Sequence, residues 1–183
     1  MKRIVLAVLV ILTLSIPSIF ASSFEVEIRA VPYQFQKYVN LATDEAETTI
    51  QGFGGQTGFK YVSDLGFTAG VEIGLDCYTY PDGTNYYTEF DGIFLGKVGL
   101  ATPIDARIGF ELDFGAGVDV CSEPDTGLMF YPSAKMSLGL RLRSLPHTDG
   151  FSMVAGIAFK VDWNKNIWLD YSLSPYFGID YKI

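Results

Sequence analysis

The sequence is poor in the residues on which most hydrolytic enzymes and nucleic-acid-binding proteins depend. Its 183 residues include one histidine, two cysteines, and 13 lysines and arginines against 21 aspartates and glutamates, for a net charge of −8. With so few basic residues, no patch can neutralise several phosphates, and we expect no nucleic-acid partner. Charged residues make up only 19% and apolar residues 49% of the chain, which is too apolar for a disordered protein.

Long apolar runs are missing after the first 20 residues. Before that point, a positively charged start, an apolar segment over 4–14 and a proline followed by small residues are typical of a secretory signal. The whole segment is short and interrupted for a spanning helix, which makes a membrane anchor the weaker alternative. We therefore expect a signal peptide over 1–23, cleaved after Ala21 or Ser23, and one domain over 24–183.

Glycine and aromatic residues are abundant, with 19 Gly, 14 Phe and 11 Tyr, and this enrichment favours β-structure over helical bundles. Apolar and polar residues alternate with a period of two, as where Glu72 lies between Val71 and Ile73. Such alternation predicts strands with one apolar and one polar face. It recurs in eight segments, which we expect to be strands: 24–30, 53–61, 66–80, 90–100, 106–120, 128–143, 151–163 and 167–183.

The connections between these segments are rich in Pro, Asp, Gly and Asn, so consecutive strands can pair as antiparallel hairpins. Alternation alone does not say which face is buried, and a soluble barrel or sandwich stays an alternative. Three features favour a membrane barrel, with its apolar face outside: small residues on the polar face, strands of 13 to 16 residues, and aromatic residues near strand ends. The aromatic residues concerned are Tyr78, Tyr80, Tyr86, Tyr87, Trp163, Trp168 and Tyr171. On this interpretation Leu138 faces outward and Gly139 inward.

The last expected strand alternates Phe177, Ile179, Tyr181 and Ile183. This resembles the C-terminal targeting signal of bacterial outer-membrane proteins, although Ile183 stands where Phe is usual. The chain from residue 24 onward resembles the small eight-stranded outer-membrane barrels of the OmpX, OmpA-domain and OmpW type in architecture. The resemblance implies an all-β, eight-stranded antiparallel up-and-down transmembrane barrel in the bacterial outer membrane. It also implies contact with outer-membrane lipid and recognition of the C-terminal strand by the barrel-assembly machinery.

Nothing in the sequence points to catalysis. The only histidine, His147, falls in an expected turn beside Pro146, so a histidine general base is not expected. A single histidine with scattered carboxylates also lacks the spacing of metal ligands, and we expect neither a metal nor a cofactor. Cys77 and Cys121 would be separated by a whole strand, beyond the reach of a disulfide unless a bulge brings them together.

Two groups of charged residues are the candidate functional residues. The first is a polar cluster expected in the barrel lumen, either as a salt-bridged plug or as a narrow path; its members are Glu72, Asp76, Lys97, Arg107, Glu111, Asp113, Lys135 and Arg141. The second is an acidic connection expected between Lys37 and Thr49, whose Asp44, Glu45 and Glu47 could contact an extracellular or host ligand.

The expected function is that of a non-enzymatic outer-membrane barrel with a structural or surface-interaction role. The first alternative is a narrow pore or conduit for small, apolar solutes, with Ile93, Leu95, Met129, Tyr131 and Val154 as the inward apolar residues that would line it. The second alternative is a soluble periplasmic barrel that binds a ligand.

Overall fold

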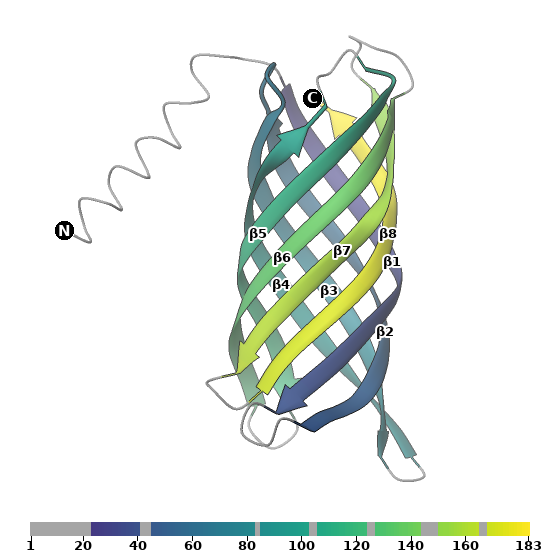
Figure 1. Ribbon diagram of the computed structural model, residues 1–183, viewed down its shortest axis with the longest axis vertical. Coiled ribbons are helices and arrows are strands. Elements are labelled where there is room, and N and C mark those ends of the chain that lie inside the picture. Colours follow the sequence, from purple (N-terminus) through teal and green to yellow (C-terminus); the bar gives the residue numbers. More distant parts are fainter. Residues whose placement is uncertain are drawn as a thin grey trace, which may run out of the picture.

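Eight antiparallel strands close into one barrel in the computed structural model, which describes residues 23–40, 45–82, 85–102, 106–123, 127–143, 150–164 and 168–183 (Figure 1). The strands are β1 (Ser23–Asn40), β2 (Glu45–Val62), β3 (Phe67–Asp82), β4 (Asn85–Ala101), β5 (Ile108–Glu123), β6 (Gly127–Arg143), β7 (Phe151–Asn164) and β8 (Trp168–Lys182). Each strand pairs with its neighbours in sequence, and β1 pairs with β8 to close the sheet. The expected all-β, up-and-down barrel is confirmed. In these described parts of the chain, no helix is long and apolar enough to cross a membrane.

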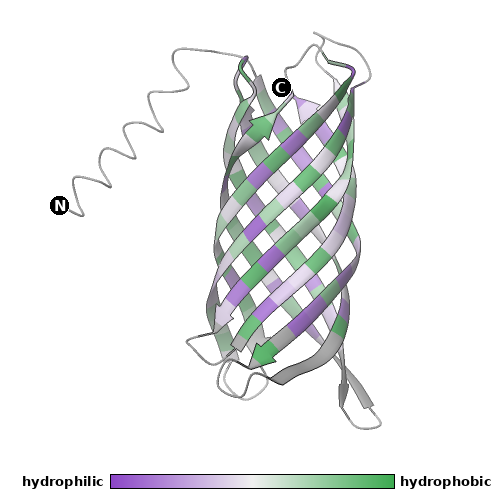
Figure 2. Cartoon of the chain, viewed as in Figure 1, coloured by the Kyte–Doolittle hydropathy of each residue, from purple (hydrophilic) through white to green (hydrophobic). Residues whose placement is uncertain are grey.

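The apolar face of every strand lies outside the barrel and the polar face lies inside. In β5, Phe110 is 63% exposed whereas its neighbour Glu111 is 2% exposed. In β6, Leu138 is 49% exposed and Gly139 is buried. Figure 2 shows the alternation of hydropathy along the strands. A soluble barrel would bury its apolar face, so the predicted inverted arrangement is confirmed.

The first strand is longer than expected, because a β-bulge interrupts the alternation of polar and apolar residues partway along it. The inward residues of β1 are odd-numbered up to Val31 and even-numbered from Gln34 onward, and the pairing with β2 shifts between these two residues. Pro32 lies at the shift, where a strand tolerates a residue without a backbone N–H donor. The bulge exchanges the inward and outward positions. A prediction that continues one period-two alternation through the bulge therefore misses the second half of the strand. The expected connection over 37–49 is therefore wrong: β1 continues to Asn40 and β2 begins at Glu45.

The two ends of the barrel differ. At the termini end lie Ser23, Lys182 and the turns after β2, β4 and β6; at the far end lie the other four connections (Figure 1). In the turn after β2, Gly66 adopts a φ of 87°, and a Cβ there would lie 2.2 Å from the carbonyl oxygen of Ala101. The far-end connections are only two to four residues long, so this barrel presents extended strands there in place of long loops.

The barrel is taller than a membrane's apolar layer. A strand of 16 residues, as β3 is, rises roughly 40 Å along the axis of a barrel whose strands are tilted by 35–45°, against an apolar band about 25 Å tall. Near the far end the outward residues turn polar, in a paired row of Gln51, Thr79 and Thr88 that are all exposed. The β3–β4 hairpin extends furthest past this row (Figure 1).

Aromatic side chains pack at the termini end, where the ring centroids of Phe24 and Phe59 are 5.2 Å apart and those of Phe151 and Tyr181 are 4.9 Å apart. Toward the far end Trp163 is 44% exposed, as expected for an interface girdle. Tyr78 was expected in the same girdle, and this is wrong. Its side chain is fully buried in the lumen, because it shares the inward phase of Asp76.

We predict that Leu138→Arg destabilises the barrel by about 2–4 kcal/mol in lipid vesicles, the cost of arginine near the bilayer midplane. Leu138 lies five residues from the end of β6 at Arg143, about half of the 9–11 residues that cross a bilayer. Urea titrations followed by tryptophan fluorescence measure the change. Leu65→Arg is the matched control, since Leu65 is 64% exposed but lies in a turn. Equal losses from both substitutions would contradict a lipid-facing Leu138.

Candidate functional site

The lumen is filled by charged side chains, and at the termini end these are paired. Arg29 contacts Glu27 at 3.2 Å and Glu111 at 3.3 Å, and it also forms an ion pair with Asp180. Lys60 lies 2.7 Å from Glu27 and 3.1 Å from Glu111. All five side chains are at least nine-tenths buried. A charge removed from water this completely is tolerated only when partners surround it, and here each charge has two or more partners.

Glu111 of β5 is the centre of this termini-end cluster. Its carboxylate oxygens accept hydrogen bonds from Arg29, Lys60 and Arg141, at 3.3, 3.1 and 2.7 Å. These donors come from β1, β2 and β6, so the bonds cross the lumen as well as linking neighbouring strands. Arg141 also forms two hydrogen bonds with Glu25, at 2.9 and 2.8 Å. The cluster ties strands together that share no backbone hydrogen bonds.

Small residues on the inward face make room for the few large ones. Tyr176 of β8 lies over Gly139 and Gly156, which pair directly between β6 and β7. A Cβ at Gly139 would lie 2.5 Å from the Tyr176 hydroxyl oxygen, and one at Gly156 would lie 2.6 Å from its ring. Tyr176 in turn lies 5.8 Å from the Arg29 guanidinium and donates a 3.4 Å hydrogen bond to Glu111.

Toward the far end one lysine stands among many carboxylates. Lys160 of β7 pairs with Asp119, with Asp162 at 3.1 Å and with Asp76 at 3.8 Å. The Tyr78 hydroxyl, which has one proton to donate, lies 3.0 Å from Gln34 Oε1 and 3.2 Å from Asp76 Oδ2. Three further carboxylates, of Glu89, Asp91 and Asp170, are buried or half-buried at the same end. We call Lys160 and these six carboxylates the far-end cluster.

The two clusters differ in charge. Among the described side chains, the ion pairs of the termini-end cluster join five cations and six carboxylates: Arg29, Lys60, Lys97, Lys135 and Arg141 with Glu25, Glu27, Glu72, Glu111, Asp113 and Asp180. The far-end cluster has one cation for six carboxylates. Buried oxygen atoms without a hydrogen-bond partner accordingly include Oδ1 of Asp76, Asp91, Asp119, Asp162 and Asp170. The termini end is nearly neutral and the far end is strongly acidic.

The predicted lumen residues are brought together with one exception. Glu72, Asp76, Lys97, Glu111, Asp113, Lys135 and Arg141 are all buried inside the barrel. Arg107 is exposed in the bend before β5 and does not reach the lumen, so its placement there was wrong. It shares the polar phase of β5, but the strand begins one residue later, and phase has no meaning outside a strand.

Several charged residues of the lumen were not included in the predicted cluster. Glu25, Glu27, Arg29, Lys60 and Asp180 all lie on the polar phase of their strands, and that phase was the signal that identifies them. Ile93, Leu95 and Val154 are buried on the inward face as predicted, at 0%, 3% and 2% exposure; Met129 and Tyr131, on the same face of β6, are half-buried.

The acidic connection does not exist as expected. Glu45 and Glu47 belong to β2, so they are not part of a long loop. Asp44, His147 and the expected signal peptide up to residue 22 lie outside the described residues. Cys77 and Cys121 form no disulfide, and β4 separates their strands. Cys121 pairs with Asp91 on the inward face, whereas Cys77 lies on the outward phase between Phe53 and Phe90.

Little space remains between these side chains. The lumen contains a cavity lined by Arg29, Glu111 and Tyr176 among others. The volume in which the centre of a water molecule can lie is about 10 Å³. That is room for about one water molecule. The described side chains of the termini-end cluster therefore lie close together across the lumen.

Comparison with known proteins supports the fold alone. No family model matches the chain, and no curated protein sequence does. Among solved structures, Neisserial surface protein A matches with a TM-score of 0.60 and 12% identity over 88% of this chain and 98% of that one. The attachment invasion locus protein Ail of Yersinia pestis, in complex with the heparin analogue sucrose octasulfate, matches with a TM-score of 0.50 and 12% identity over 88% of this chain and 100% of that one. This chain has the architecture of the small eight-stranded outer-membrane barrels.

We predict that Glu111→Gln lowers the free energy of unfolding by about 3–5 kcal/mol, because it removes the buried negative charge that three buried cations share. Glutamine keeps the volume of the side chain, so the loss reports charge and not packing. Asp64→Asn, at an exposed turn carboxylate, is the control and changes stability by less than about 0.5 kcal/mol. Urea titration in vesicles compares the two, and a loss below 1 kcal/mol for Glu111→Gln would contradict a shared ion-pair centre.

Proposed function

We propose that this chain is a non-enzymatic β-barrel of the bacterial outer membrane with a structural or surface-interaction role. The observation that carries the proposal is the combination of an apolar outer face with a lumen plugged by ion pairs. The outer face suits outer-membrane lipid as its surroundings. The C-terminal strand, with Phe177, Ile179 and Tyr181 exposed on one face, is the proposed contact with the barrel-assembly machinery.

The closed lumen weighs against the pore alternative. Eight strands leave an interior that side chains can fill, and here the hydrogen bonds of Lys60 with Glu111 and of Arg141 with Glu25 span it. The soluble alternative is weaker still, because aromatic and aliphatic side chains all around the barrel are exposed, among them Phe53, Phe94 and Phe130. Exposed apolar surface on this scale marks contact with a membrane or a partner.

Surface interaction would take place at the far end, where the strands project past the polar row of Gln51, Thr79 and Thr88. In the sequence, segments 41–47, 82–89, 122–127 and 164–168 together hold seven acidic residues and one basic residue. A sulfated ligand such as the one bound by Ail carries the same sign of charge, so we propose that a partner of this chain is cationic.

Planar-bilayer recordings test the plug. The purified barrel is expected to give no unitary conductance above the lipid baseline, since ions cannot pass side chains that leave space for about one water molecule. A general porin reconstituted in the same lipid serves as the positive control for insertion and detection. Stable, uniform conductance steps from the barrel would contradict the plug and favour the pore.

Epitope insertion tests the location and orientation. A short tag placed between Gly83 and Thr84, in the β3–β4 connection, should bind antibody on intact cells. The same tag after Asp64, in the turn between β2 and β3 at the termini end, should bind only after the outer membrane is permeabilised. The opposite pattern would reverse the orientation, and labelling of neither tag on folded, membrane-fractionated protein would contradict a surface role.

A further inference from the structure

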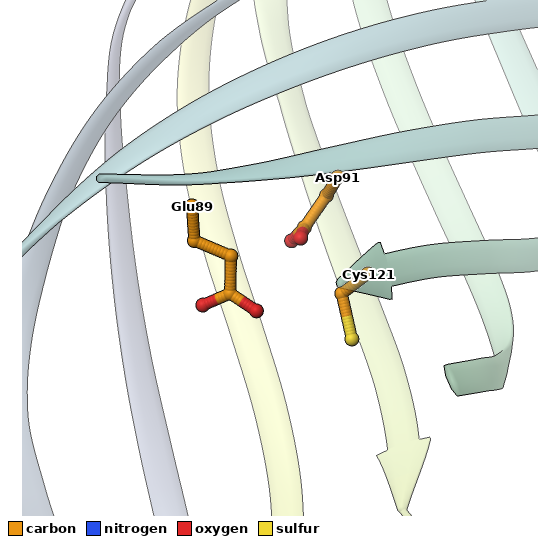
Figure 3. Close-up of side chains that lie close together, drawn as sticks. All are labelled: Glu89, Asp91 and Cys121. Atoms are coloured by element: carbon orange, nitrogen blue, oxygen red, sulfur yellow. The ribbon is translucent and has the colours of Figure 1, made fainter. Parts of the chain in front are cut away.

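The far-end cluster contains three side chains with the composition of a metal site. Glu89 and Asp91 lie two residues apart on the inward face of β4, and Cys121 of β5 pairs directly with Asp91. One ligand atom from each, a carboxylate oxygen from Glu89 and from Asp91 and the Cys121 sulfur, lie within 4.8 Å of one another. Figure 3 shows the three side chains reaching from these neighbouring strands toward a common space.

Asp91 gives a second, independent indication that something binds there. Its side chain is 7% exposed, and its Oδ1 atom is buried without a hydrogen-bond partner among the described residues. Directly across the β3–β4 pair lies Asp76, whose Oδ1 is also unpartnered. An ionised carboxylate in such a place is strongly unfavourable unless a positive charge neutralises it.

Positive charge is scarce among the described side chains of the far-end cluster. Lys160, the one cation of the far-end cluster, already contacts Asp119, Asp162 and Asp76. The described far-end cluster thus holds six carboxylates and one lysine. At the termini end the same kind of lumen is nearly balanced, so the excess belongs to the far end and not to the barrel as a whole.

We propose that Glu89, Asp91 and Cys121 bind a divalent metal ion of the Zn²⁺ class. The thiol decides the class, because Ca²⁺ and Mg²⁺ take oxygen ligands, whereas Zn²⁺ accepts sulfur and carboxylate oxygen together. On binding, the Cys121 thiol loses its proton to solvent and the thiolate sulfur coordinates the ion. Two ligands of a tetrahedral Zn²⁺ are about 3.5 Å apart, so the three atoms need to close by only about 1 Å.

Access and coordination number fit the position at the barrel mouth. Glu89 is half-buried and lies at the level where the outward residues turn polar, so an ion can enter from the far end. Three protein ligands leave a fourth position for water or for a group from a partner. With the ion bound, Glu89, Asp91 and the Cys121 thiolate together carry one negative charge more than the ion neutralises, so the far end stays acidic.

Direct binding is the first test. The purified barrel in detergent micelles, stripped with a chelator, is dialysed against Zn²⁺ and its bound metal is counted. We expect one Zn²⁺ per chain, and Co²⁺ in its place should give a thiolate-to-cobalt charge-transfer band. Cys121→Ser should weaken binding at least ten-fold and abolish that band, and Asp91→Asn should weaken binding at least ten-fold. Cys77→Ser, the matched control at the other cysteine, should change neither.

Thiol protection in the unmodified chain is the second test, and it does not depend on variants that fold. Zn²⁺ should slow alkylation of Cys121 at least ten-fold and leave Cys77 unchanged, as counted by mass spectrometry of the two peptides. Equal alkylation rates with and without Zn²⁺ would overturn the site. So would metal binding that Cys121→Ser leaves intact, which would indicate an all-oxygen cation site among the aspartates.

Discussion

Eight strands close around a space so narrow that inward side chains have only one another as partners. A charge on the polar phase that water does not reach is therefore stable only beside an opposite charge, from the same strand, a neighbour or the opposite wall. At the termini end this constraint is met by Glu111, which holds three cations from three strands. The small residues follow from the same constraint, since Tyr176 fits only because Gly139 and Gly156 carry no side chain.

Inside and outside could be predicted from the sequence because strand geometry has a period of two everywhere. The prediction failed where that period is interrupted or ends. The bulge at Pro32 reverses the phase of β1, so a continuous strand appeared to stop at Ala30 and a loop appeared in its place. Arg107 has the correct phase but precedes its strand by one residue. Tyr78 was assigned to a girdle from its residue type, although its phase, shared with Asp76, indicates the lumen.

The contacts between side chains within the lumen could not be predicted from the sequence, for a different reason. Alternation says that Glu111 and Lys60 both face inward, but not that they meet, since 51 residues separate them. Their contact depends on how far each strand is shifted against the next all the way around the barrel. The bulge in β1 contributes to that shift and was itself not visible. The pairing of Asp91 with Cys121 was unseen for the same reason, although both lie on the inward phase of adjacent strands.

The two ends of the lumen differ in charge, and this difference is the feature of the fold that bears most directly on the proposed function. A barrel that only needed to be stable would pair its carboxylates throughout, as this one does at the termini end. The unpaired oxygens of Asp76, Asp91 and Asp119 lie instead toward the far end, where Asp76 and Asp91 are each three residues from the polar outward residues Thr79 and Thr88. Close to water, an excess of negative charge costs less than it would in the middle of the barrel, because mobile cations can occupy the site. The ion pairs of the termini end therefore stabilise the barrel, and the proposed binding function is placed at the far end, within one continuous sheet.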